Sequence, residues 1–350
     1  MALRLPVHGG ECIGELAEMP MVRSLTGRRA PRLLRLVARD AGHEGIVVEQ
    51  HIREGRFQRS LALIAAFSAL LGGLDVTYEH YRGSYSQRVM YGPVLISPLV
   101  VLRGVWGAFN RRVARSLLPL AAAALLADGV LGFVFHVRGV ARKPGGWRIP
   151  VFNVVMGPPL FAPLLLGISG LLGVIASVLR REDDPARTKL TGLPLQRLAR
   201  VGFLPRKVAR RGIVLERQVR EGRFQKWLAA ATAISALLNG LESLYAHYKN
   251  NFTYKSQWLP ILLSPLIAIA GIGTVWSKRM ARTWLPITSL LATLNGAVGL
   301  FYHGRGVLRR SGGVKKLGYN VVYGPPIFAP LLYAATGFVG MLASLLRRAE

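Results

Sequence analysis

Long uncharged stretches divide the chain into apolar segments. Fifteen uncharged residues separate Arg59 from Asp75, and twelve separate Arg115 from Asp128. No charged residue occurs among the thirty from Pro150 through Leu179. Because about 20 apolar residues cross the hydrocarbon core of a bilayer as a helix, these segments predict membrane-spanning helices. We therefore expect an all-α integral membrane protein.

The apolar pattern occurs twice, at a constant offset of 167 in the numbering. IREGRFQ begins at Ile52 and VREGRFQ at Val219, and NVVMGPPLFAPLL at Asn153 matches NVVYGPPIFAPLL at Asn320. The match continues without a gap between residues 46–182 and 213–349. Agreement over such a length predicts an internal duplication. Residues related by this offset are called matched residues below.

Each copy is expected to contain four spanning helices, which makes eight transmembrane helices in all. The expected ranges are 61–81, 92–110, 116–136 and 151–179, and then 228–248, 259–277, 283–303 and 318–346. Because four crossings return the chain to its starting side, the copies are predicted to be two parallel four-helix repeats, related by an axis along the membrane normal. The expected parts are a basic N-terminal segment (1–45), repeat 1 (46–182), a basic linker (183–212) and repeat 2 (213–350).

The distribution of charge predicts the orientation. The chain has 350 residues, with 46 Lys and Arg against 17 Asp and Glu, and a formal net charge of +29. The side holding both termini, the linker and the connections between second and third helices carries 33 of the 46 basic residues, and the other side carries 13. Cytoplasmic loops are rich in Lys and Arg, so both termini are expected in the cytoplasm, in an inner or plasma membrane.

The same charge predicts partners. Residues 31–39 and 194–203 form short basic amphipathic stretches, which are typical of helices that lie on anionic lipid. We expect the bilayer and anionic lipid at the cytoplasmic face as partners, and no nucleic acid. The first twenty residues hold no apolar run of signal-peptide length, so no cleaved signal is expected. Oligomeric state does not follow from the pattern.

Familiar catalytic patterns are missing from the sequence. Cys12 is the only cysteine, which excludes an intramolecular disulfide and a CxxC metal or dithiol site. The chain has no HExxH, no GxSxG, no P-loop and no dinucleotide-binding fingerprint ahead of a soluble fold. No class of enzyme is therefore predicted, although a redox role in the membrane stays open.

Four of the seven histidines are expected at the outer ends of the first and third helices. His80 and His136 occupy these positions in the first copy, and His247 and His303 in the second. Neutral imidazole binds transition metals and heme iron, so the four residues are candidates for holding heme b or a transition metal. Small residues such as Gly132 lie beneath them and leave room for either a porphyrin or another helix.

Carboxylates are expected near the same membrane boundary. Asp75 and Glu242 occupy matching positions, and Glu79 stands one turn beyond Asp75. Ionisable groups at membrane depth are candidates for function, here as metal ligands or proton-exchange groups. His80 lies about 140° around the helix from Asp75, so a shared site has to combine different helices.

A polar path through the bundle is an alternative. Asp128 is expected deeper in the membrane, and Asn153 and Asn320 begin the two fourth helices. Pro98 and Pro163 are expected to kink their helices. Corresponding broken segments in two repeats are typical of a transporter binding site, so the acid and the two asparagines are candidates for a proton or substrate path.

Three functions follow from these patterns. The first is a membrane redox or metal protein that passes electrons or protons near the outer leaflet. The second is a proton-coupled transporter of a small solute, in which Asp128 is essential. The third is a non-enzymatic scaffold that binds lipid. The fourfold placement of histidine favours the first.

Overall fold

The computed structural model describes residues 44–184 and 206–348. One helix covers 44–53, and the apolar helices belong to a compact unit, Ile52–Glu350. Apart from helices, the described residues form a single isolated β-bridge, between Arg56 and Arg180. Cys12, His8, His43 and the basic stretches 31–39 and 194–203 lie outside the described residues.

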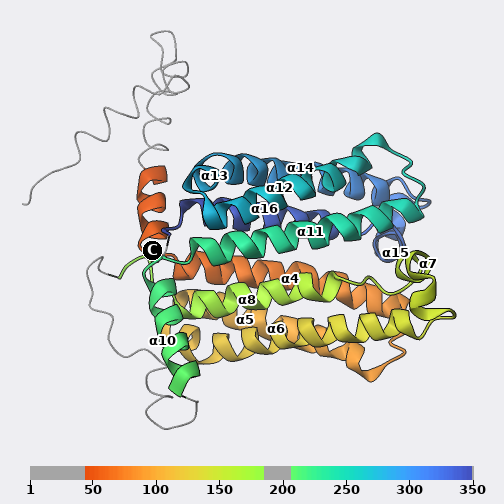
Figure 1. The fold of residues 1–350 in the computed structure, drawn as a ribbon. Helices are drawn as coiled ribbons and strands as arrows, with labels where there is room; N and C mark the ends of the chain where they lie inside the picture. Colours follow the sequence, from red (N-terminus) through yellow and green to blue (C-terminus); the bar gives the residue numbers. More distant parts are fainter. Residues whose placement is uncertain (1–43, 185–205, 349–350) are drawn as a thin grey trace, which may run out of the picture. The chain divides into compact units, whose positions relative to one another are not determined.

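The unit is built of helices in two successive groups (Figure 1). The first group is α4 (Gln58–Arg82), η1 (Arg88–Met90), α5 (Tyr91–Phe109), α6 (Arg111–Ala141), η2 (Gly146–Arg148), α7 (Pro150–Val155) and α8 (Ala162–Val178). After α10 (Arg206–Arg220), the second group is α11 (Gln225–Lys249), η3 (Lys255–Trp258), α12 (Leu259–Trp276), α13 (Lys278–Arg282), α14 (Trp284–Leu308), η4 (Gly313–Lys316), α15 (Leu317–Tyr323) and α16 (Ala329–Leu345). The first and last residues of α4 and α8 are matched to those of α11 and α16.

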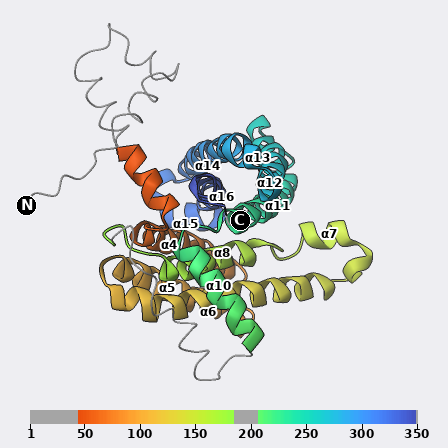
Figure 2. The same cartoon turned by 60° about the vertical axis from the view of Figure 1, so that its left-hand side comes forward.

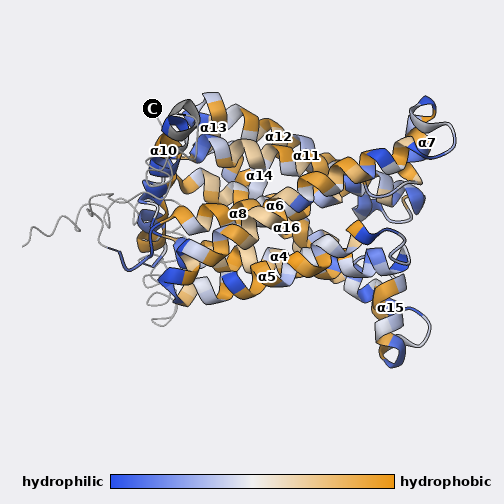
Figure 3. Cartoon of the chain, turned by 90° about the horizontal axis from the view of Figure 1, so that it is seen from below, coloured by the Kyte–Doolittle hydropathy of each residue, from blue (hydrophilic) through white to orange (hydrophobic). Residues whose placement is uncertain are grey.

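Within the described residues, six helical segments are long and apolar enough to cross a membrane: α4, η1–α5, α6, α11, η3–α12 and α14. This confirms the all-helical class. The helices α8 and α16 are apolar but have 17 residues each. Apolar side chains at intervals of seven residues point away from the bundle on α5 and α12, and are 60–75% exposed: Leu95, Leu102, Phe109, Leu262, Ile269 and Trp276. Such stripes suit contact with lipid, and Figure 3 shows mainly hydrophobic colouring along the helices between the two ends of the bundle.

The fourth apolar segment of each group is interrupted, which corrects the prediction of continuous helices over 151–179 and 318–346. The first segment breaks between α7 and α8 at Gly157-Pro158-Pro159, and the second breaks between α15 and α16 at Gly324-Pro325-Pro326. Proline has no N–H to donate and its ring clashes with the preceding turn, so two adjacent prolines end a helix. Pro163 then lies in the first turn of α8 rather than at a kink, whereas Pro98 is inside α5 as predicted.

The third helices are longer than predicted. They end at Ala141 and Leu308, so His136 and His303 lie five residues before the helix end. Within each group, the fourth helix packs closely on the third. A Cβ atom at Gly129 would lie only 2.6 Å from the Pro163 carbonyl oxygen, and one at Gly296 would lie 2.6 Å from that of Pro330. Small residues of this kind let helix backbones approach each other.

The two groups meet through α4 with α16 and α11 with α8 (Figure 2). A shared hydrophobic cluster at this contact includes Leu61, Leu172, Leu228 and Val339. We call the end of the bundle where α4 and α11 begin the basic end, and the end holding His80, His136, His247 and His303 the histidine end. Because α4 and α16 run in opposite directions, as do α11 and α8, the two interrupted segments both lie toward the histidine end.

Candidate functional site

At the basic end, the two groups contact each other through matched residues. Phe57 stacks on Phe224, with 6.4 Å between the ring centroids and 10° between the planes. The preceding turns contain Gly55 and Gly222, at φ +69° and +68°. A Cβ atom on Gly55 would lie 2.5 Å from the Arg220 carbonyl oxygen, so this close approach requires glycine. Both phenylalanine rings are at most 4% exposed, and they close the contact at this end.

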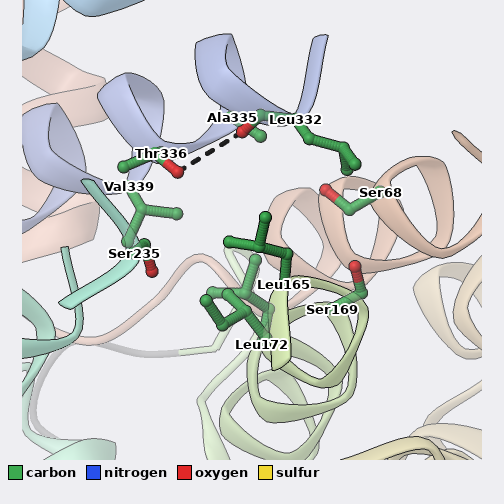
Figure 4. Close-up of a pocket in the computed structure, with 10 residues that line it drawn as sticks. Ser68, Leu165, Ser169, Leu172, Ser235, Leu332, Ala335, Thr336 and Val339 are labelled. Carbon is green, nitrogen blue, oxygen red and sulfur yellow. Dashed lines mark hydrogen bonds between the residues drawn. The ribbon is translucent and has the colours of Figure 1, made fainter. Parts of the chain in front are cut away.

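Midway along the bundle, residues of α4, α8, α11 and α16 line a partly open cavity of about 20 Å³. Its polar lining consists of Ser68, Ser169, Ser235 and Thr336, each at most 6% exposed. Ser235 is the residue matched to Ser68, and Thr336 is the residue matched to Ser169. Figure 4 shows these side chains among the leucine, alanine and valine side chains of the same four helices. A polar space of this size can hold one water molecule.

The four hydroxyl groups differ in their hydrogen bonds. Ser235 donates to the carbonyl of Ala231 on its own helix, and the Thr336 hydroxyl donates to that of Leu332 and accepts from the Asn239 amide at 3.0 Å. Among the described residues, the hydroxyls of Ser68 and Ser169 have no protein partner. They are therefore available to a molecule in the cavity. Hydropathy does not reveal this site, although hydroxyl residues at matched positions inside apolar helices would have indicated it.

Nearer the histidine end, α11 binds the interrupted segment of the first group. One carboxylate oxygen of Glu242 accepts hydrogen bonds from the N–H groups of Phe161 and, at 3.0 Å, Ala162. The hydroxyl of Tyr245 accepts one from Leu160 at 3.0 Å. Three successive N–H groups just before and at the start of α8 thus receive acceptors from the other group. A negative charge at a helix N-terminus is also favoured by the helix dipole.

The matched residues on α4 are arranged differently. Asp75 accepts a hydrogen bond of 2.7 Å from the hydroxyl of Tyr78. Asp75 interacts electrostatically with both Glu242 and Glu79, so the three predicted carboxylates belong to one region. Glu79 also forms a half-exposed ion pair of 3.0 Å with Arg82.

The four predicted histidines share one local arrangement, in which Nδ1 contacts a backbone carbonyl. The distances are 2.8 Å for His80 and Met90, 2.5 Å for His136 and Pro159, 3.0 Å for His247 and Gln257, and 2.6 Å for His303 and Pro326. Because a carbonyl can only accept, Nδ1 carries the hydrogen and Nε2 keeps its lone pair. Each imidazole also interacts electrostatically with the other of its group. Within residues 44–184 and 206–348, no three His, Cys, Asp or Glu side chains are grouped to hold a metal ion.

The space beside the glycines beneath the histidines is filled by neighbouring helices. Cβ atoms built on Gly132 and Gly299 would each lie 2.9 Å from the Cβ of a proline on the next helix, Pro163 or Pro330. One built on Gly73 would lie 2.7 Å from the Cβ of Ser97. These contacts favour helix packing over room for a porphyrin.

The predicted path residues do not meet at the cavity. The Asn153 amide donates to the carbonyls of Pro144 and Gly146, at 3.0 and 2.7 Å, and Asn320 does the same for Ser311 and Gly313. Both asparagines are 1% exposed, and their hydrogen bonds fix the loops that precede α7 and α15. Asp128 lies against Gly92 at the start of α5 and is half-buried. Its helix, α6, packs on α5 and α8 of its own group.

Ion pairs stabilise the basic end of the first group. The carboxylate of Glu182 accepts from the backbone N–H groups at positions 59 and 60, where α4 begins. Asp183 is paired with Arg59 at 2.9 Å and Arg111 at 3.3 Å, and lies 3.4 Å from Arg181. Desolvation raises the pKa of Asp183, but the three guanidinium groups together outweigh it and hold that pKa below its usual value.

No model of a known protein family matches the chain, and no curated protein or solved structure is significantly similar to it. The geometry of the site therefore carries the functional inference.

Proposed function

We propose that the chain is a multi-pass membrane transporter built of two parallel four-helix repeats. Protons cross the membrane along the interface between the repeats. The observation that carries this proposal is the hydroxyl-lined cavity among α4, α8, α11 and α16, where matched side chains of the two groups face one another. Transporters built from repeats bind their cargo near the bilayer midplane, at the repeat interface and next to broken helices. Ser68 is ten residues into the 25-residue α4, about 15 Å along a helix of about 37 Å, which is close to mid-depth.

In this proposal the chain crosses the membrane eight times. The helices α8 and α16, each about 25 Å long, complete their crossings together with the interrupted segments before them. The basic end is cytoplasmic, since Lys and Arg concentrate on that side, and its surface contacts anionic lipid. The Phe57–Phe224 stack then closes the cytoplasmic end, and the Asp75–Glu242 region lies toward the outside.

The size of the cavity supports protons as the cargo rather than a larger solute. A space of about 20 Å³ admits a water molecule and little more. The unpartnered hydroxyls of Ser68 and Ser169 can bind that water, which then accepts and donates protons. Asp75 and Glu242 are ionisable groups on α4 and α11 toward the histidine end, and in this proposal they supply proton exchange with the outer side.

Proton flux into liposomes tests the proposal. The purified protein is reconstituted around a trapped pH-sensitive dye, and a pH gradient is imposed with potassium and valinomycin to balance charge. We expect flux above the leak of empty liposomes, and its loss in Glu242→Gln. Asp128→Asn is the matched control, because it neutralises a carboxylate in the same bundle away from the cavity. Absence of flux in the wild-type protein, or loss in Asp128→Asn alone, contradicts the proposal.

A heme or a transition metal held by the histidines is a second candidate function. The observation that favours it is the fixed Nδ1–H to carbonyl hydrogen bond on all four rings, an arrangement that orients histidine ligands in metal sites. An absorption spectrum of the oxidised and reduced protein, with elemental analysis, tests it. This candidate predicts a Soret band lost in His136→Ala and His303→Ala, or stoichiometric metal. A colourless, metal-free protein expressed with cofactor supplied contradicts it.

A further inference from the structure

The two groups differ at one pair of matched contacts. Before α8, the N–H groups of residues 160–162 are bound by Tyr245 and Glu242. Residues 327–329 follow the same Gly-Pro-Pro interruption, and α16 begins at the matching position. Among the described residues, however, the N–H groups of 327–329 have no acceptor.

Residues 327–329 are partly buried. A rearrangement that pairs their N–H groups is favoured wherever water does not reach them, and most strongly in hydrocarbon. The helix that can supply acceptors is α4, because it packs on α15 and α16 just as α11 packs on α7 and α8. Asp75 and Tyr78 occupy on α4 the positions that Glu242 and Tyr245 occupy on α11.

Side-chain length accounts for the difference. Aspartate is one methylene shorter than glutamate, which reduces the reach of the carboxylate by about 1.5 Å. In the structure the Asp75 carboxylate accepts from Tyr78 instead, at 2.7 Å. Glu242 and Tyr245 therefore bind the opposite group, whereas Asp75 and Tyr78 are hydrogen-bonded to each other.

We propose that Asp75 and Tyr78 form a second clamp that binds residues 327–329 when Glu242 and Tyr245 release residues 160–162. The two clamps alternate, and their exchange opens and closes the interface toward the histidine end. That consequence for proton movement rests on the proposed function. The alternation itself is measurable without any transport.

Amide hydrogen exchange of the full-length protein in lipid nanodiscs, resolved by mass spectrometry, tests the proposal. In the wild-type protein, we expect residues 160–162 to exchange about tenfold more slowly than residues 327–329, the effect of roughly one net hydrogen bond. Glu242→Asp gives both groups the shorter acid, so the first segment should exchange faster and the second more slowly until the two rates converge. Asp75→Glu should slow residues 327–329. Asp128→Glu, a change of the same length on α6, should leave both segments unchanged.

The decisive result is whether exchange at 327–329 slows when exchange at 160–162 becomes faster. Faster exchange at 160–162 in Glu242→Asp, with no slowing at 327–329, would show a fixed asymmetry and overturn the proposal. Asp75→Glu keeps the proposal testable if Glu242→Asp does not fold, because unchanged exchange at 327–329 in that variant overturns it as well. Linked exchange in a protein without proton flux would leave the alternation standing and remove the proposed function.

Discussion

Replacing Gly296 with alanine should push α14 and α16 apart. The added Cβ would lie 2.5 Å from the Ala334 Cβ and 2.6 Å from the Pro330 carbonyl oxygen, whereas ordinary contacts begin at 3.4 Å. The helices must then separate by up to about 0.9 Å, the difference between 3.4 and 2.5 Å. Overpacking of this kind costs about 1–3 kcal/mol.

Gly304, on the same helix, provides the control because a Cβ there would meet nothing within 4 Å. Both substitutions gain about 0.5–1 kcal/mol from the loss of a helical glycine, and this gain cancels when the two variants are compared. We expect Gly296→Ala to be less stable than Gly304→Ala by about 1–3 kcal/mol. Unfolding by added SDS in mixed micelles, followed by circular dichroism, measures the difference. Equal stabilities would refute the packing of α14 on α16.

Three further variants test other contacts. Tyr245→Phe removes the acceptor of the Leu160 N–H and should cost about 1–3 kcal/mol in the same SDS titration, and an unchanged stability would contradict the clamp. Asp183→Asn should lower the free energy of unfolding slightly at neutral pH. Because the pKa of Asp183 is depressed in the folded protein, the difference from wild type should vanish as the pH falls through that pKa. A difference in stability that persists in acid argues against the ion pairs. Asn153→Ala frees two loop carbonyls and should lower the thermal midpoint, a shift that an exposed or unneeded amide would not produce.

Charge gaps predict the long helices well and their interruptions poorly. The uncharged run from Pro150 to Leu179 suggests a continuous span because hydropathy does not register which residues can donate a backbone hydrogen bond. Gly157-Pro158-Pro159 does carry that information, and the helix breaks there. The ends of the third helices follow instead from the polar residues after His136, which continue the helix beyond its apolar part.

The structure brings only some of the candidate residues together, because they were chosen for their chemistry alone. Asp75 and Glu242 interact electrostatically because each lies on a helix that packs against the opposite group, a correspondence that the offset makes visible. Asn153 is committed to a loop, which only the folded backbone reveals. Ser68 resembles other serines of apolar helices in the sequence, and only the fold shows that it lines a cavity with residues of three other helices.

A protein whose cavity is filled gives the most direct test of a proton path among α4, α8, α11 and α16. Ser68→Leu fills the space among α4, α8, α11 and α16, whereas Ser68→Ala keeps it open and removes only the hydroxyl. In the liposome assay, we expect Ser68→Leu to lower proton flux to the leak of empty liposomes and Ser68→Ala still to conduct protons. Wild-type flux through a correctly folded Ser68→Leu protein would contradict a proton path through this cavity.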